Sequence, residues 1–212
     1  MRPLIPAPLE LETFDGAAWL GVVPFGMRGV RPRATPAVPW LSAFPELNVR
    51  TYVTLADKPG VWFFSLDAGN PVAVRTARQA FHLPYYDARM MIGHEGKGLI
   101  HYTSRRTHRS APPTLFAARY RPTGPVALAG QGSLAAWLTE RYCLYAADRR
   151  SGIWRGEIHH ARWPLQPAEV EIECNTMAAP LGVTLHSSRP LLHFAQRLDV
   201  VAWTLEAVHA PL

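Results

Sequence analysis

Two neighbouring segments that alternate like β-strands constrain the fold of this chain most strongly. They span residues 47–55 and 61–66, and a turn-forming stretch with the order Ala-Asp-Lys-Pro-Gly joins them. Alternate side chains of a strand point to one face of a sheet. The polar side chains that share one face of the first strand are Glu46, Asn48, Arg50 and Tyr52. This face is either a solvated surface or the wall of a cavity.

Proline and glycine residues occur throughout the chain. The 212 residues include 20 prolines and 15 glycines, which separate many short segments. Such punctuation favours a β-rich barrel or sandwich over repeated β-α-β units. No internal repeat and no low-complexity linker divides the sequence. We therefore expect a single domain over residues 1–212.

The remaining segments supply further strands and two short helices. Strands are expected at residues 17–25, 88–92, 99–104, 115–120, 142–147, 153–160 and 168–174. Helices are expected at residues 72–81 and 134–140, because Asn70 and Ser133 are good N-cap residues.

Three connections are predicted from local composition. Residues 9–14 and 17–25 are expected to form a hairpin around an Asp-Gly turn. Residues 26–39, rich in Arg, Pro and Gly, are expected to form a long loop. Residues 191–208 alternate weakly and predict one long final strand, with a helix as the competing prediction.

Composition and charge limit the class of protein. With 48% hydrophobic and 18% charged residues the chain is globular. The net charge is +6, but the basic residues are scattered and no run of five like charges occurs. A nucleic-acid binder gathers its basic residues on one face. We expect no nucleic-acid partner.

Cysteine usage and hydropathy indicate a cytoplasmic protein. Cys143 and Cys174 lack metal or redox spacing and lie in apolar surroundings, which is typical of buried free thiols in a reducing compartment. The first residues contain prolines and lack the apolar core of a signal peptide. The apolar run at residues 17–25 is too short to span a bilayer, which needs about 20 residues.

Several familiar chemistries are disfavoured. Nine histidines are present, but none has the spacing of a zinc site. Ser133 follows Gly-Gln-Gly and does not form the nucleophile elbow of serine hydrolases. No nucleotide-binding loop occurs, and Lys58 and Lys97 both lie in turns, where a Schiff-base lysine with a lowered pKa is not expected. We expect no metal and no cofactor.

After these exclusions, the polar residues that lie within apolar strands remain as candidates for a functional site. A buried arginine needs a carboxylate partner, which comes either from the protein or from a ligand. Two interpretations therefore stay open for the pairs Glu46–Arg50 and Glu140–Arg141. They are structural ion pairs, or they form part of a site for a small anion or carbonyl compound.

The sequence resembles a bacterial family of uncharacterised proteins, the YqjF-like or DUF2071 family, over nearly its whole length. The matching segments are residues 44–53, 60–68, 83–85, 138–142, 158–159 and 162–165. Members of this family usually have a further N-terminal segment, so the resemblance implies that this chain lacks it.

The family in turn is similar to acetoacetate decarboxylase at residues 4–11 and 64–81. This distant resemblance implies a β-rich α+β fold, a closed, cone-shaped antiparallel β-barrel with two or three short helices and a small cavity. The decarboxylase uses a lysine just after the matching helix, whereas residues 82–86 here contain no lysine. The resemblance therefore implies the fold but not Schiff-base decarboxylation.

From these observations we expect a cytoplasmic protein that binds a small organic carboxylate or carbonyl compound inside the barrel. Arg50 and Arg141 would clamp the ligand, and Asn48, Tyr85 and Tyr142 would orient it. If there is catalysis, Glu46 or Asp67 would be the acid–base group, with His159 in reserve. Glu46, Asn48 and Arg50 would then point into the barrel, while Leu47, Val49 and Thr51 would pack outward beneath the helices.

Two other classes of function stay open. One is a lyase or hydrolase that acts on small keto acids or aromatic compounds without a Schiff-base lysine. The other is a structural or partner-binding protein with a filled barrel, in which residues 26–39, with Arg28, Arg31 and Arg33, would form a docking loop or a dimer arm. Both leave homo-oligomerisation open.

Overall fold

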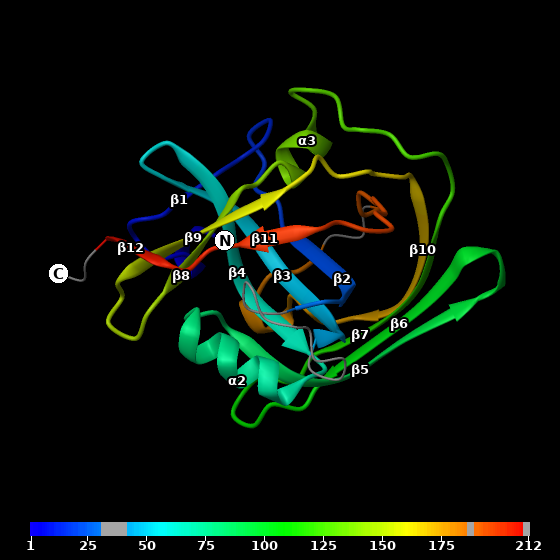
Figure 1. The fold of residues 1–212 in the computed structure, drawn as a ribbon, viewed down its shortest axis with the longest axis horizontal. Helices are drawn as coiled ribbons and strands as arrows, with labels where there is room; N and C mark the ends of the chain where they lie inside the picture. Colours follow the sequence, from blue (N-terminus) through cyan, green and yellow to red (C-terminus); the bar gives the residue numbers. More distant parts are fainter. Residues whose placement is uncertain (31–41, 186–188, 210–212) are drawn as a thin grey trace.

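The computed structural model describes residues 1–30, 42–185 and 189–209, and it is β-rich with a few short helices (Figure 1). The first strands are β1 (Glu10–Leu11), β2 (Gly21–Met27), β3 (Phe44–Leu55), β4 (Lys58–Ala68), β5 (Tyr85–Glu95) and β6 (Leu99–Arg106). They are followed by β7 (Leu115–Pro122), β8 (Cys143–Ala147), β9 (Ile153–His160), β10 (Ala168–Asn175), β11 (Val200–Ala202) and β12 (Glu206–His209). The helices are α2 (Pro71–Ala80) and α3 (Leu134–Thr139), with 3-10 turns η1 (Arg2–Leu4), η2 (Gly96–Gly98) and η3 (Ala179–Leu181).

Strands β3 and β4 form the central hairpin of the sheet. They pair antiparallel from Glu46 opposite Ala68 to Leu55 opposite Lys58. Ala56 and Asp57, between the strands, have φ angles of 50° and 59°. This left-handed backbone is what a two-residue hairpin turn of type I′ requires. The predicted strands and their turn are confirmed, with the turn shorter than expected.

The other edge of β4 is shared by two strands. Residues Leu66–Ala68 pair in parallel with the start of β5, and Val61 and Trp62 pair in parallel with β8. A parallel pair needs a crossover connection, and α2 provides it between β4 and β5. The Asn70 side-chain oxygen accepts hydrogen bonds from the backbone N–H groups of Val72 and Ala73, which confirms the predicted cap.

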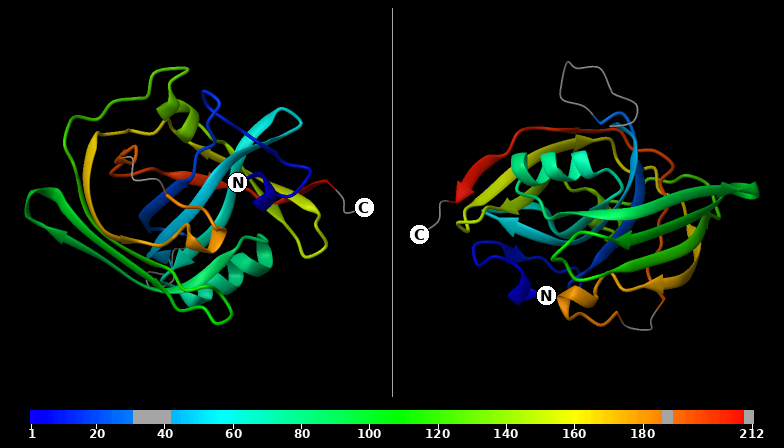
Figure 2. Two further views of the ribbon diagram at one scale, coloured as in Figure 1. Left: turned by 180° about the vertical axis from the view of Figure 1, so that it is seen from behind. Right: turned by 90° about the horizontal axis from the view of Figure 1, so that it is seen from below.

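From this centre the sheet curls in two directions. One arm runs through β5, β6 and β7 to β10, and the other runs through β8 and β9 to β11. Helices α2 and α3 lie at opposite ends of the molecule (Figures 1 and 2). The pairing order begins at β10 and ends at β11. Closure into a barrel therefore stays a prediction, whereas the β-rich architecture with few helices is confirmed.

The layers that pack against the two faces of β3 differ from the prediction. Leu47 and Val49 pack against Tyr102 and Phe116, which belong to the curled arm of β6 and β7. Glu46 shares the opposite face with Phe44, which packs against Val74 of α2. The predictions that Leu47 and Val49 pack beneath the helices and that Glu46, Asn48 and Arg50 point into the barrel are therefore wrong. The curled arm supplies the apolar layer that covers Leu47 and Val49, and the polar row lies on the opposite face, toward α2 and α3.

Other local predictions also need correction. Phe14 and Ala17 form the expected antiparallel bridge, but β1 and β2 each pair with β3 and not with one another. The long final strand is replaced by β11 and β12, two short strands that both pair with β9. Neither a long strand nor a helix forms there, because residues 203–205 interrupt the pairing with β9 between Ala202, which lies opposite Ile158, and Glu206, which lies opposite Arg155. Most of the predicted loop at residues 26–39, including Arg31 and Arg33, lies outside the described residues.

The cysteines agree with the prediction only in part. Cys143 is buried as predicted, whereas Cys174 is half-buried, and both are free thiols. Across the described segments no helix has the length and hydrophobicity needed to cross a membrane.

Candidate functional site

A row of polar side chains follows one face of β3 from the end near α2 to the end near α3. Its members are Glu46, Asn48, Arg50 and Tyr52. Same-face neighbours of a strand are about 6.8 Å apart, so the row is continuous. Glu46, Asn48 and Tyr52 are buried, and Arg50 is half-buried. Buried polar groups of this kind need partners.

At the end of the row near α3, two arginines and a tryptophan surround the Tyr52 ring. The guanidinium carbons of Arg50 and Arg141 lie 5.8 Å and 5.1 Å from the ring centroid, within range of cation–π attraction. The Trp137 ring lies 4.7 Å from the Tyr52 ring, and the Arg141 guanidinium carbon lies 4.4 Å from the Trp137 ring. We call Arg50, Tyr52, Trp137, Arg141 and Glu12 the Tyr52 site.

Two contacts hold the Arg141 side chain in this site. Its Nη1 forms an ion pair with Glu12, and its Nε donates a hydrogen bond to the Trp137 carbonyl oxygen at 2.7 Å. Its Nη2 is buried without a hydrogen-bond partner. The residue is only 5% exposed, so this donor is cut off from bulk water. A fixed arginine with one spare donor is suited to bind an anion.

Arg50 has weaker partners than Arg141. Within the described chain no carboxylate lies within ion-pair distance of Arg50, and its Nε is buried without a hydrogen-bond partner. Its Nη2 reaches the Leu138 carbonyl oxygen only at 3.5 Å. Gly21 on β2 faces it: a Cβ there would lie 3.6 Å from both Arg50 Nε and the Tyr52 hydroxyl. The same Cβ would lie 3.3 Å from Arg50 Cγ, so glycine avoids crowding the Arg50 side chain.

Asn48 lies between Glu46 and Arg50 in the row. It is buried, and its side-chain oxygen has no hydrogen-bond partner. The unpartnered oxygen is an acceptor and suits a ligand hydroxyl group, whereas a ligand carbonyl group would accept a hydrogen bond from the Asn48 amide N–H. Asn48, Arg50 and Arg141 together offer unsatisfied polar atoms on one face of the sheet.

Glu46 and Tyr85 form a buried pair at the end near α2. The Tyr85 hydroxyl donates a hydrogen bond to Glu46 Oε2 at 3.0 Å. Burial raises the pKa of Glu46 to about 7, although the hydrogen bond from Tyr85 opposes the change. Burial and the nearby Glu46 raise the pKa of Tyr85 well above its usual value, so Tyr85 remains the donor. Glu46 can therefore gain and lose a proton near neutral pH.

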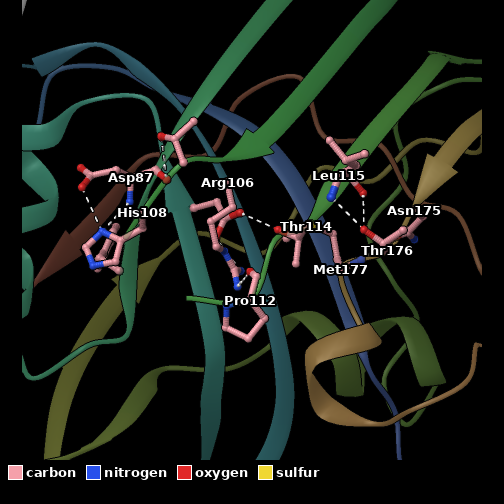
Figure 3. A network of polar contacts seen from close by, with 12 residues as sticks. Asp87, Arg106, His108, Pro112, Thr114, Leu115, Asn175, Thr176 and Met177 are labelled. Carbon is pink, nitrogen blue, oxygen red and sulfur yellow. Dashed lines mark hydrogen bonds and ion pairs between the residues drawn. The ribbon is translucent and has the colours of Figure 1, made fainter. Parts of the chain in front are cut away.

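Asp67 lies on the opposite face, away from the row. It pairs in register with Leu47, and its oxygens accept hydrogen bonds from Arg106 Nε at 2.9 Å and the Thr114 hydroxyl at 3.2 Å. Figure 3 shows Arg106 and Thr114 in a network that continues to Pro112. Burial raises the pKa of Asp67, and Arg106 partly offsets this. The carboxylate is engaged in a structural ion pair.

Tyr142 and His159 lie apart from the row as well. The Tyr142 hydroxyl donates to Glu140, and its ring stacks on His160 at 4.8 Å. His159 is exposed on β9, whereas its neighbour His160 is buried. The structure therefore brings Arg50 and Arg141 together at Tyr52, with Asn48, Glu46 and Tyr85 further along the same face. It does not bring Asp67, Tyr142 or His159 to them.

Three residues of the site were not selected from the sequence. Tyr52 continues the alternation of the row, and this signal could have identified it. Trp137 lies in α3 whereas Arg141 follows the end of that helix, so no helical spacing connects the two in the sequence. No local signal connects Glu12 with Arg141, which lies 129 residues further along the chain.

A pocket opens beside α3 next to this site. Its volume is about 550 Å³. The side chains that matter here are Glu12, Phe14, Trp137, Glu140, Arg141 and Arg162. Among the residues that the structure describes, no group of three or more His, Cys, Asp or Glu side chains could hold a metal ion.

Comparisons with known proteins give the family and the fold. A family model described as DUF2071, an uncharacterized conserved protein, matches residues 1–199. "Uncharacterized protein YqjF" of Bacillus subtilis (strain 168) is 45% identical over 205 residues, which are 97% of this chain and 83% of that protein.

Solved structures with a similar fold include two groups of proteins. One is acetoacetate decarboxylase, with a TM-score of 0.56 at 11% identity, covering 98% of this chain and 81% of that chain. The other is the enduracididine biosynthesis enzyme MppR. Its structure with HEPES buffer bound has a TM-score of 0.60 at 10% identity, covering 98% of this chain and 80% of that chain. Its structure complexed with pyruvate has a TM-score of 0.57 at 10% identity, covering 96% of this chain and 80% of that chain. At these identities the likeness establishes the fold alone.

The burial of Glu46 predicts a pH-dependent stability. The pKa of the folded state, about 7, exceeds the usual value of 4.5, so the folded protein binds the proton more tightly than the unfolded chain. The contribution of Glu46 to the free energy of unfolding is therefore fully present below pH 4.5 and is lost as the pH rises through 7. Because Gln mimics the protonated acid, Glu46→Gln should exceed the parent in free energy of unfolding by about 3 kcal/mol at pH 8 and match it near pH 4.5.

Urea denaturation at several pH values measures this difference. Glu206→Gln, at an exposed position of β12, is the matched control and should show no such pH-dependent gain. A Glu46→Gln variant whose advantage does not change with pH would contradict a raised pKa.

Proposed function

The chain belongs to the DUF2071 family of uncharacterized conserved proteins, and on that premise we propose that it binds a small organic carboxylate with a neighbouring carbonyl group. The ligand's carboxylate lies against Arg50 and Arg141 in the Tyr52 site. Its carbonyl group points along the row toward Asn48. The ligand is held on the face of β3 that α2 and α3 flank.

The incomplete pairing of Arg50 is the observation that carries the proposal. Its guanidinium is partly removed from water and its Nε is buried, so an anionic partner would compensate part of the desolvation penalty. Arg50 and Arg141 contribute two positive charges near one ring, and Glu12 contributes one negative charge. Two arginines and one glutamate give the site an excess of one positive side chain. A monoanionic ligand neutralises it.

The chemistry of the donors selects a carboxylate. Arginine binds carboxylates through paired N–H groups, and the two spare donors are Arg50 Nε and Arg141 Nη2. The Asn48 amide supplies a hydrogen bond for a carbonyl oxygen next to the carboxylate. Support also comes from the shared fold, since one MppR structure is described as complexed with pyruvate, a 2-oxo acid.

Titration calorimetry with pyruvate tests the binding. The parent protein should bind pyruvate, and Arg50→Gln should weaken the affinity by about 10- to 100-fold, because a charge-assisted hydrogen bond contributes about 1.5–3 kcal/mol. Arg89→Gln, at an exposed arginine of β5, is the control and should keep the parent affinity.

Folding must be separated from binding in this test. Thermal unfolding of each variant without ligand shows whether Arg50→Gln is still folded. A folded Arg50→Gln protein that binds pyruvate as tightly as the parent would contradict the proposal. If no oxo acid binds the parent protein, the alternative of a filled, structural core gains support.

Catalysis is a second candidate function, favoured by the pKa of Glu46. A carboxyl group that titrates near 7 is suited to general acid–base catalysis at neutral pH. Glu46 would remove a proton from the carbon next to a carbonyl group, and the Asn48 amide would donate a hydrogen bond to the resulting enolate oxygen. Because Glu46 lies about 14 Å from Arg50 along the strand, this substrate would bind at the Asn48–Glu46 end of the row and not at Arg50. Lys58 is committed to an ion pair with Glu157 at 2.6 Å, so this chemistry uses no Schiff base on Lys58.

Hydrogen–deuterium exchange tests this second function. In D₂O the protein should speed the exchange of the methyl protons of pyruvate, observed by NMR, and the rate should rise with pH through about 7 as Glu46 loses its proton. Glu46→Gln should abolish the acceleration while binding persists. If the variant exchanges pyruvate as fast as the parent, Glu46 is not the base.

A further inference from the structure

The pocket beside α3 is larger than the proposed anion site needs. Its volume of about 550 Å³ lies well within the range of about 300–1,000 Å³ found for pockets that enclose whole organic ligands. A three-carbon acid bound at Arg50 and Arg141 would leave it unused. The pocket therefore bears on the size of the ligand.

An aromatic wall leads from the pocket to the Tyr52 site. The Phe14 and Trp137 rings are 5.8 Å apart and tilted by 56°, and the Trp137 and Tyr52 rings are 4.7 Å apart. Tilted rings at these distances favour contact with a further flat apolar group. The wall has no polar group of its own except the edges of Trp137 and Tyr52.

Arg141 joins the pocket to the anion site. It lines the pocket, and its guanidinium carbon lies 4.4 Å from the Trp137 ring centroid and 5.1 Å from the Tyr52 ring centroid. The residue is 5% exposed, and its Nη2 has no hydrogen-bond partner. A carboxylate bound to Arg141 would hold the rest of its molecule next to the aromatic wall.

Several other polar side chains of the pocket are already engaged. Glu12 is paired with Arg141, and Glu140 accepts the hydrogen bond of Tyr142. Arg162 donates to the Ala129 carbonyl oxygen. The Ser133 hydroxyl bonds to Gly130 and accepts from the backbone of Ala136. Glu12 and Glu140 are therefore not free to bind a cationic group of the ligand.

We infer that the ligand is an aromatic 2-oxo acid, whose carboxylate binds at Arg50 and Arg141 and whose uncharged ring fills the pocket against Phe14 and Trp137. This inference rests on the proposed function and narrows it. It distinguishes the protein's ligand from the three- and four-carbon acids that would satisfy the anion site alone.

Calorimetry with two acids tests the inference. Phenylpyruvate should bind at least tenfold more tightly than pyruvate, because its ring enters the pocket. Phe14→Ala removes one ring of the wall at a half-buried position near the surface, where the fold should tolerate it. In this variant the ratio of the two affinities should fall toward one. Trp203→Ala, an exposed aromatic residue beside β11, is the control and should keep the parent ratio.

The outcomes separate the two proposals. If pyruvate binds and phenylpyruvate binds no more tightly, the inference about the ring is overturned and the proposed function stands. If phenylpyruvate binds more tightly but Phe14→Ala leaves the ratio unchanged, the ring lies elsewhere and the inference is overturned. If neither acid binds the folded parent protein, the proposed function fails and the inference fails with it.

Discussion

Strand β3 is covered on both faces, so each polar side chain that it carries must find a partner inside the protein or in a ligand. On the face turned toward β6 and β7 this requirement is met, because Leu47 and Val49 are apolar and the Thr51 hydroxyl donates to the Trp19 carbonyl oxygen. On the other face it is met only in part. Glu46 has Tyr85, whereas Asn48 and Arg50 retain unpartnered atoms.

Burial affects the ionisable groups differently at the two ends of this face. At the end near α2, burial favours the neutral form of Glu46, so the carboxyl group holds its proton up to about pH 7. At the end near α3 the arginines remain charged, and the electron-rich rings of Tyr52 and Trp137 partly replace water around them. A proton-transferring group and a positively charged site thus occupy one face of a single strand. Asp67 on the neighbouring strand shows the contrasting case, a carboxylate paired with Arg106 and bonded by Thr114.

Local patterns in the sequence predicted the elements but not their long-range arrangement. The alternation at residues 47–55 and the caps Asn70 and Ser133 depend on neighbouring residues only, and the structure confirms all three. Family resemblance predicted the type of fold. The covered face of β3 could not be predicted, because alternation shows which side chains share a face and not which layer lies against it. The partners of Asp67 and Arg141 depend on the curl of the sheet and on residues 39 and 129 positions away.

The central claim is that an organic carboxylate completes the coordination of Arg50 and Arg141. A crystal structure of the protein grown with pyruvate tests it most directly. The account predicts a carboxylate within hydrogen-bond distance of Arg50 Nε and Arg141 Nη2, with its carbonyl group toward Asn48. Pyruvate bound only at another place, or Arg50 paired with a carboxylate of the protein in that crystal, would contradict it.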